Sequence, residues 1–161
     1  MEEEKTTNWI DLDDLGIELG TVKLKKNEFF KIMEKDFPKG TRLTIANVGN
    51  TYESKFRNKN TEDRNAAFFI DYTFKHEGLT KEVGISYSLG KEIRPDIYEI
   101  GSRTNLYRLL KPLFENLPET DTITIDMNKI RNLQGLEFIG KAKLIYGNPK
   151  DYYIIVPVKE I

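Results

Sequence analysis

The 161-residue chain contains 39% apolar and 32% charged residues, which is typical of a globular protein with a charged surface and excludes a largely disordered chain. It has no cysteine, so disulfides and zinc–thiolate sites are excluded and an intracellular, cytoplasmic location is favoured. No apolar run approaches the roughly 20 residues that a membrane-spanning helix needs.

The net charge of −1 conceals an uneven distribution along the chain. Residues 1–20 contain seven acidic residues and one lysine, a net charge of −6, whereas residues 21–161 contain 24 basic and 19 acidic residues, a net charge of +5. A basic body is compatible with phosphate binding, and equally with an ordinary charged surface. We therefore expect an acidic N-terminal arm (residues 1–20) followed by a single domain (residues 21–161).

Alternating apolar and polar residues predict three antiparallel strands in the first half of the body. In the second strand, Phe68 and Ile70 share the buried face, whereas Phe69 lies on the outer face. Residues 21–33 fit either a strand or a short helix. The three strands are expected over residues 41–48, 66–74 and 82–89, with a turn at residues 76–81.

The second half of the body predicts one amphipathic helix and a final hairpin. The helix is expected over residues 102–118, with Ser102 as its N-cap and with Pro112 kinking or shortening it. A short strand is expected at "TITIDM", and the hairpin pairs residues 138–146 with residues 152–158.

Three antiparallel strands, a helix and a two-stranded hairpin follow the order of an OB-fold, which is a small five-stranded Greek-key barrel. We therefore predict a mainly β, OB-fold-like barrel with one helix. Another small α+β antiparallel sheet, or a sandwich with one helix, remains an alternative.

Signatures of catalysis are weak in this sequence. The single histidine, His76, is expected to be a solvated residue in a turn, and there is no cysteine nucleophile or Gly-rich phosphate loop. Asp11, Asp13 and Asp14 do not match an EF-hand. We expect a protein that is not an enzyme and needs no metal or cofactor. An enzyme that acts on nucleic acid through Glu53, Asp71 and a metal is the weaker alternative.

Aromatic and basic residues alternate in the two loops that would flank the ligand face of an OB-fold. The loops are expected over residues 51–65 and 146–153, where aromatic rings would stack on nucleobases and basic side chains would neutralise phosphates. Tyr153 is preferred to Tyr152 because Tyr152 shares a face with Ile154. The candidate phosphate ligands are Lys55, Arg57, Lys59, Arg64, Lys141, Lys143 and Lys150, and the candidate stacking residues are Tyr52, Phe56, Phe69, Tyr146 and Tyr153.

The segments "GSRTNLYRLL" and "LQGLEFIGKAKLIYG", the latter followed by a Tyr-rich return, resemble the single-stranded DNA-binding proteins of phages and mobile elements that have an OB-fold. The resemblance is one of layout and covers roughly residues 38–161. It implies a protein of viral type that coats single strands during DNA replication or recombination, without a cofactor and inside the host cell. Many such proteins carry an acidic partner-binding tail at the C-terminus, whereas the acidic segment here is N-terminal.

The acidic arm has two open roles. It can recruit a replication or recombination protein through Trp9, Asp11, Asp13 and Asp14, or it can occupy the basic groove of its own body and compete with nucleic acid. The alternative function is therefore a protein-interaction module, such as a virion or replisome accessory factor, that uses this arm. The choice between DNA and RNA and the formation of oligomers both remain open.

Overall fold

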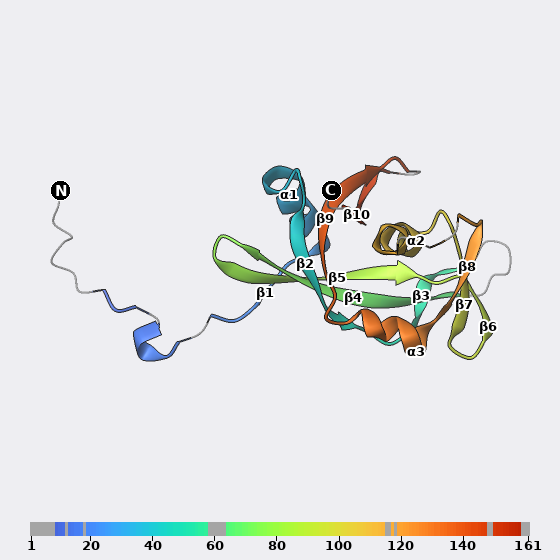
Figure 1. Ribbon diagram of the computed structural model, residues 1–161, viewed down its shortest axis with the longest axis horizontal. Helices are drawn as coiled ribbons and strands as arrows, with labels where there is room; N and C mark the ends of the chain where they lie inside the picture. Colours follow the sequence, from blue (N-terminus) through green and yellow to red (C-terminus); the bar gives the residue numbers. More distant parts are fainter. Residues whose placement is uncertain are drawn as a thin grey trace.

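A computed structural model describes residues 9–11, 13–17, 19–57, 64–114, 117, 119–147 and 150–158, and the side chains of residues 13, 54–57, 64 and 65 lie outside this description. The protein is mainly β and contains two sheets (Figure 1). The larger, mixed sheet has the order β1-β5-β4-β2-β9-β10, with β3 also paired to β4. Its strands are β1 (Val22–Lys23), β2 (Thr41–Val48), β3 (Tyr52–Arg57), β4 (Arg64–His76), β5 (Leu79–Ser88), β9 (Glu137–Ile145) and β10 (Tyr152–Pro157).

The long hairpin of β4 and β5 is the centre of the larger sheet. Its register is continuous from Ala67 opposite Ser88 to His76 opposite Leu79. A two-residue turn joins the strands, and both of its residues have positive φ, as in a type I′ turn whose twist matches that of the strands. The predicted alternation is confirmed, because the core contains these side chains: Phe68, Ile70, Tyr72, Phe74, Val83, Ile85, Tyr87 and Leu89.

β2 and β3 follow one another along the same edge of β4. Val48 of β2 pairs with Ile70, and Tyr52 of β3 pairs with Ala67. Gly49 lies at the bend between the two strands, where its N–H donates to the Phe69 carbonyl at 2.8 Å. Part of the segment predicted as a loop over residues 51–65 is therefore strand, because its backbone pairs with β4 although its side-chain pattern is irregular.

The predicted barrel is not closed. β1 and β10 are the two edges of the larger sheet, and no pairing joins β5 to β10 in the described part of the chain. Two helices lie at this opening: α1 (Lys26–Asp36) contacts β5 and β9, and α2 (Asn105–Leu110) contacts β5 and β10. Buried side chains of both helices, among them Phe29 and Leu106, complete the core that the sheet leaves open.

A second sheet has the order β6-β7-β8 and consists of β6 (Lys91–Arg94), β7 (Ile97–Gly101) and β8 (Thr122–Asp126). The strand expected at "TITIDM" is confirmed as β8. The sequence did not predict β6 and β7, because β6 is exposed along its whole length and shows no alternation. Tyr98 and Ile100 of β7 nevertheless extend the core into this sheet. Further elements are η2 (Asp13–Leu15), η3 (Lys111–Leu113), α3 (Met127–Ile130) and η4 (Arg131–Leu133).

The predicted helix at residues 102–118 is shorter than expected and begins later. Its N-cap is Thr104, whose hydroxyl accepts from the Tyr107 N–H, and not Ser102. Pro112 lies in η3, the short 3₁₀ helix that follows α2. The α-helix therefore ends before the proline, as the missing N–H of this residue requires.

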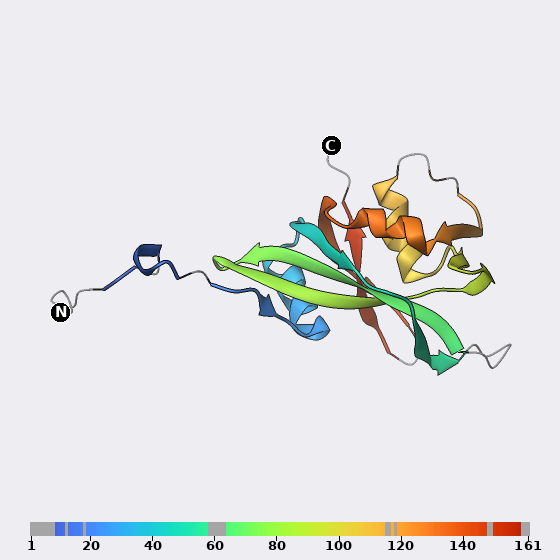
Figure 2. The same ribbon diagram turned by 90° about the horizontal axis from the view of Figure 1, so that it is seen from below.

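The described residues of the arm (9–11, 13–17, 19 and 20) lie beyond the end of the body that carries the β4–β5 turn, as Figures 1 and 2 both show. The α3 helix and the smaller sheet lie toward the opposite end (Figures 1 and 2). Within the described residues, no helix combines the length and the apolar composition needed to cross a bilayer.

Candidate functional site

The outer face of β3, β4 and β5 carries a pair of exposed aromatic rings. Phe69 points to this face because its neighbours Phe68 and Ile70 are fully buried on the opposite one. The Tyr52 ring lies parallel to it, with ring centroids 5.3 Å apart and an angle of 16° between the ring planes. Phe69 is 45% exposed and Tyr52 is 37% exposed. A stack of two rings therefore faces solvent.

A hydrogen bond holds the Tyr52 ring across three strands. The Tyr52 hydroxyl lies 2.6 Å from Ser86 Oγ, and Ser86 is the residue of β5 that pairs with Phe69. The tyrosine side chain thus starts on β3, passes beside Phe69 on β4 and ends on β5. This bond restricts the tyrosine rotamer, so that less conformational entropy is lost when a ligand stacks on the ring.

Small residues surround the two rings. An added Cβ at Gly84 would lie 2.9 Å from Asp71 Oδ1, and one at Gly49 would lie 3.3 Å from the Phe69 carbonyl oxygen. A larger residue at Gly84 would therefore crowd the Asp71 carboxylate and the edge of the Phe69 ring, and one at Gly49 would crowd the Phe69 backbone. The glycines keep the surface low, which leaves the aromatic stack accessible.

Asp71 adds a hydrogen-bond acceptor to the same face. It lies two residues after Phe69 in β4, and its Oδ2 accepts from Asn47 Nδ2 at 3.2 Å. A carboxylate repels phosphate, but it accepts hydrogen bonds from the N–H groups at the edge of a nucleobase. This surface is therefore suited to a planar group that has donors on its edge, with any phosphates held elsewhere.

The structure brings only some of the predicted residues to this face. Tyr52 and Phe69, which were predicted as separate stacking residues in a loop and on a strand, are adjacent. Tyr146 is 82% exposed in the turn between β9 and β10, and Lys150 is exposed in the same turn. The side chains of Lys55, Phe56, Arg57 and Arg64, and the whole of Lys59, lie outside the described residues.

The choice of Tyr153 as the exposed tyrosine of β10 is wrong. Tyr153 packs on Phe30 of α1 with ring centroids 6.0 Å apart, and its hydroxyl donates to Glu34 Oε1 at 2.8 Å. This hydrogen bond raises the pKa of Tyr153. Tyr152 is instead 38% exposed, although it shares the face of Ile154 as expected. The alternation of side chains along β10 does not reveal the exposed face, because both faces of this strand are covered. Ile155 faces the core, and Ile154 faces α2.

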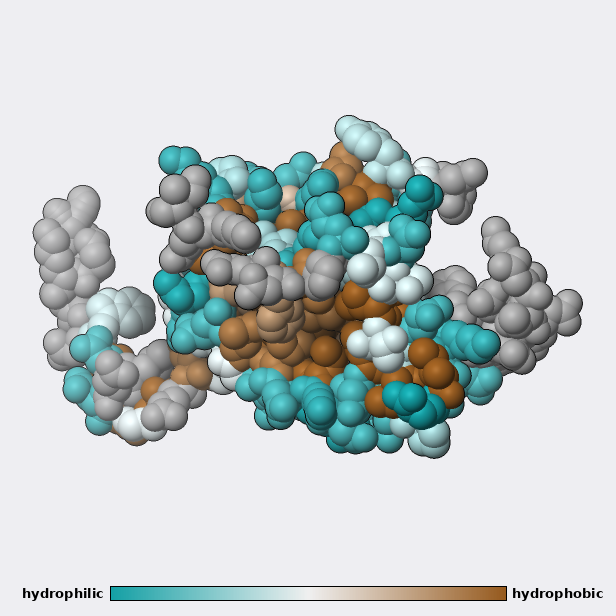
Figure 3. Space-filling view, turned by 45° about the vertical axis from the view of Figure 1, so that its right-hand side comes forward, coloured by the Kyte–Doolittle hydropathy of each residue, from teal (hydrophilic) through white to brown (hydrophobic). Residues whose placement is uncertain are grey.

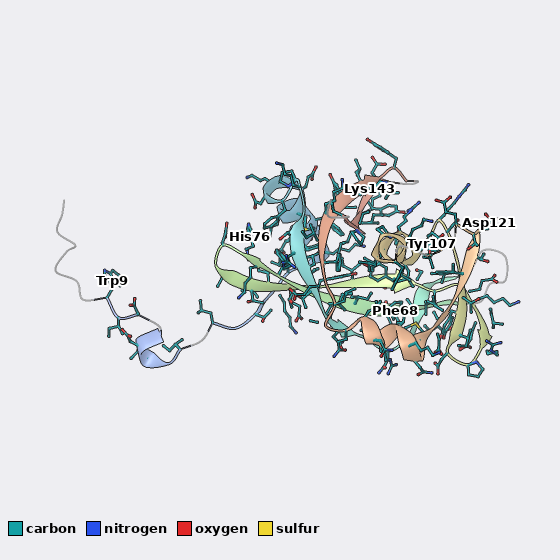
Figure 4. All side chains as sticks on the ribbon, in the orientation of Figure 1. Trp9, Phe68, His76, Tyr107, Asp121 and Lys143 are labelled. Atoms are coloured by element: carbon teal, nitrogen blue, oxygen red, sulfur yellow. The ribbon has the colours of Figure 1, made fainter. Side chains whose placement is uncertain are left out.

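The two lysines of β9 do not join the aromatic stack. Lys141 and Lys143 are exposed as predicted, but β2 separates β9 from β4. Lys143 instead lines a hollow of about 240 Å³ between α2, β9 and β10, together with Arg108 and Lys111. Figure 4 shows Lys143 close to the helix that carries Tyr107, another residue of this hollow.

Sequence reasoning missed Arg108 and Lys111 as partners of Lys143. Both residues are held by neighbours: Arg108 Nη1 donates to Asn105 Oδ1 at 3.3 Å, and Lys111 Nζ lies 3.4 Å from Glu119 Oε1. Arg108 lies in α2 and Lys111 is the first residue of η3, which follows directly, so their spacing of three residues places them on one side of this helical segment. This spacing was the available signal. Three cations therefore converge at a second place, away from the aromatic stack.

His76 is not the solvated residue that the sequence suggested. Its Nε2 lies 2.8 Å from Asp36 Oδ2 of α1, and its Nδ1 lies 2.9 Å from Lys81 Nζ. Because the lysine ammonium can only donate, Nδ1 is the acceptor and Nε2 carries the hydrogen that is donated to Asp36. Both the histidine and the lysine side chains are only 11% exposed, so this chain of contacts ties α1 to the β4–β5 hairpin.

In the described ranges, no three His, Asp or Glu side chains lie close enough together to hold a metal ion. Of the predicted arm residues, Trp9, Asp11 and Asp14 are exposed, and the Asp13 side chain lies outside the description. No protein-family model matches the chain, and neither a curated protein nor a solved structure matches it.

Proposed function

We propose that the protein binds single-stranded nucleic acid, without catalysis, by stacking bases on Tyr52 and Phe69. The observation that carries the proposal is the exposed, parallel pair of rings on a sheet face that glycines keep low. Stacking of a base on an aromatic side chain contributes about 1–3 kcal/mol and depends little on sequence. In duplex DNA the base faces are covered by neighbouring bases, so an exposed ring stack favours a single strand.

The order of the strands supports an OB-type barrel that has opened. In this interpretation, β2 with β3 forms the first strand, and β4, β5, β9 and β10 form the second to fifth. The first strand then pairs with the second and the fourth, and α2 precedes the fourth, as expected for this fold. The aromatic stack would lie on the face of strands two and three, where OB-folds bind oligonucleotides.

The positions of the hairpin ends support a nucleic-acid strand that crosses Phe69. The outer ends of the β3–β4 hairpin and of the β9–β10 hairpin lie on the same side of the molecule in Figure 2, and in Figure 1 they lie at its right and at its top. A strand that crosses Phe69 would run between them. Tyr146, Lys150 and Tyr152 belong to the second of these ends, and Lys55, Arg57 and Arg64 belong to the first. The phosphates would meet these basic residues, while Asp71 would accept hydrogen bonds from base edges.

Fluorescence anisotropy with labelled single-stranded DNA tests the proposal. An oligonucleotide of about 30 nucleotides exceeds the ~4–16 nucleotides that one OB-type site covers. We expect binding that weakens steeply between low and high salt and that prefers the single strand to a duplex of the same length. Titration with single-stranded RNA of the same sequence measures whether the protein prefers ribose or deoxyribose.

The matched variants are Phe69→Ala and Ile93→Ala, since Ile93 is an exposed apolar residue of β6, in the other sheet. The first should weaken binding and the second should not. Equal affinity of both variants, or tighter binding of duplex, would count against stacking on this face.

The arm supports a second candidate, a protein-interaction module. Trp9 is 84% exposed, and Ile10, Leu15 and Leu19 are also exposed. Exposed apolar side chains that are concentrated in one segment mark a protein–protein contact surface. Pull-down of host replication proteins by the full chain but not by a Trp9→Ala variant would favour this candidate.

A further inference from the structure

One hollow of the described surface is an apolar groove, which is distinct from the aromatic stack. Its volume is about 800 Å³, and its walls come from η3, β8, α3, η4, β9 and β10. Figure 3 shows a broad apolar area with a hydrophilic border on the side of the molecule that carries these elements. The lining includes Phe114, Ile130, Leu133, Leu136 and Val158, and its charged members are Asp126, Lys129 and Glu137.

Exposed apolar side chains are concentrated in three places. Tyr52, Phe69, Tyr146 and Tyr152 belong to the candidate nucleic-acid surface. Phe114 and Leu136, in the groove, are exposed as well. The other concentration is the arm, where the exposed residues are Trp9, Ile10, Leu15, Ile17 and Leu19. A groove and a segment that both expose apolar surface can each remove the other from water.

The geometry separates the arm from the groove of its own body. The described arm residues, Trp9 among them, lie beyond the end that carries the β4–β5 turn, whereas α3 and β8 lie toward the opposite end (Figures 1 and 2). In Figure 4, Trp9 lies apart from every other labelled side chain. An arm in this direction meets the groove of a neighbouring molecule more readily than its own.

We propose that the groove binds the N-terminal arm of a second copy of this chain. Trp9 and its apolar neighbours would fill the groove, and the acidic residues of the arm would remain at its border, where Lys129 lies. The charge of the body as a whole supports this occupant, because the arm carries a net charge of −6 and residues 21–161 carry a net charge of +5. The groove lining itself holds two acidic residues and one lysine, so the attraction comes from basic residues outside the groove. The proposal does not depend on nucleic-acid binding.

The contact joins two different surfaces, so it is head-to-tail. Each copy has one arm and one groove, and a contact of this type propagates into chains unless its rotation closes a ring. The protein should therefore associate in steps as its concentration rises. Salt should weaken the association, because part of the attraction is between exposed charges.

Sedimentation velocity and tryptophan fluorescence test the proposal together. Trp9 is the single tryptophan of the chain, so its emission reports the arm alone. As concentration rises, we expect the mass to exceed the 18.8 kDa of the monomer and the emission to move to shorter wavelength in parallel. Burial of a tryptophan at the centre of a contact is typical of an interface hot spot.

Two full-length variants break opposite sides of the contact and retain Trp9. Ile10→Asp with Leu15→Asp changes the arm, and Phe114→Asp with Leu136→Asp changes the groove. All four positions are exposed, so the fold should survive, which far-UV circular dichroism and thermal unfolding check. Each variant alone should associate at least about 30-fold more weakly than the parent chain. Ile93→Asp, at an exposed position of β6, is the control and should associate normally.

Mixing the two variants gives the decisive result. The arm variant still has a groove and the groove variant still has an arm, so the mixture should form a 1:1 dimer and stop there. A monomer at all concentrations with short-wavelength emission that the groove variant abolishes would place the arm in its own groove and overturn the proposal. A monomer with a solvated tryptophan, or association that both variants retain, would overturn it as well.

Discussion

The β4–β5 hairpin has two faces with opposite character. On the inner face, Phe68 and Ile70 are fully buried, and the Tyr72 and Tyr87 hydroxyls lie 2.7 Å apart in the core. On the outer face, Phe69 is exposed beside small and polar residues, although its ring is the same size as that of Phe68. Two adjacent phenylalanines therefore have different surroundings: Phe68 packs in the core, and Phe69 contacts solvent.

Burial therefore decides which of the two phenylalanines contributes to stability and which is available for the proposed binding. A phenylalanine gains free energy in the core because its area is removed from water. At an exposed position the same area is left available to a ligand. Substitutions on the inner face should therefore change the free energy of unfolding, and those on the outer face should change affinity.

The largest effect is expected for Phe68→Ala. The ring is fully buried and packs against Tyr87 with centroids 6.0 Å apart, so its removal leaves a cavity. We expect the free energy of unfolding to fall by about 3–5 kcal/mol, measured by urea denaturation with the slope checked for two-state behaviour. Phe69→Ala is the control and should lose at most about 1.5 kcal/mol, the value of one aromatic pair. Equal losses would mean that the two faces do not differ in packing.

Alkaline pH should destabilise the inner face. Burial raises the pKa of Tyr72 well above its usual range, and burial also raises the pKa of Tyr87. The unfolded chain releases these protons near pH 10 while the folded protein keeps them, so stability is complete below about pH 10 and falls as pH rises. The expected loss between about pH 9 and pH 11 is about 1.4 kcal/mol in total for each tyrosine, measured by urea denaturation, and the slope becomes steeper toward the alkaline end of this range.

The control for this pH dependence is Tyr72→Phe with Tyr87→Phe, which removes both hydroxyls and leaves the ring volumes. The double variant should show a shallower loss of stability at alkaline pH. The single variant Tyr72→Phe should lower the free energy of unfolding by more than half of the decrease in the double variant. It leaves the buried Tyr87 hydroxyl without this partner. An unchanged slope in the double variant would assign the alkaline loss to other groups.

The two faces of this hairpin were predictable from the sequence, and the last strand was not. Alternation located the core side of β4 and β5 because each strand buries one face only. In β10 it misplaced Tyr153, because α1 covers one face of that strand and α2 the other. Which face is covered depends on helices far away in the sequence, and a local pattern carries no record of them.

Contacts between elements that are far apart in the sequence also decide whether the sheet closes into a barrel and which cations lie together. The order of strands and helix suggested a barrel, but α1 and α2 contact the strands on both sides of the opening. Lys143 was predicted as a phosphate ligand near Phe69, yet it lies with Arg108 and Lys111 on the far side of β2. The Tyr52–Phe69 pair was only partly foreseen, because Tyr52 was assigned to a loop and belongs to β3.

The outer face is tested most directly by Phe69→Ala in single-strand binding. Loss of one stacking ring should weaken affinity by about 5–150-fold, equivalent to about 1–3 kcal/mol. The dependence of affinity on salt should not change, since no phosphate contact is removed. Fluorescence anisotropy at two salt concentrations measures both. A variant that loses affinity mainly at low salt and has a smaller salt slope would indicate an electrostatic and not a stacking role.

The smallest expected effect is that of Ser86→Ala, which leaves both rings in place and removes the partner of the Tyr52 hydroxyl. The free energy of unfolding should fall by about 0.5–1.5 kcal/mol at most, the net value of one hydrogen bond. Affinity for a single strand should fall by less than about tenfold, because the ring must then be ordered on binding. Tyr52→Phe removes the same bond from the other side and should give the same Kd. If Tyr52→Phe instead binds like the parent chain while Ser86→Ala does not, Ser86 contacts the ligand itself, and the hydrogen bond is not what orients the ring.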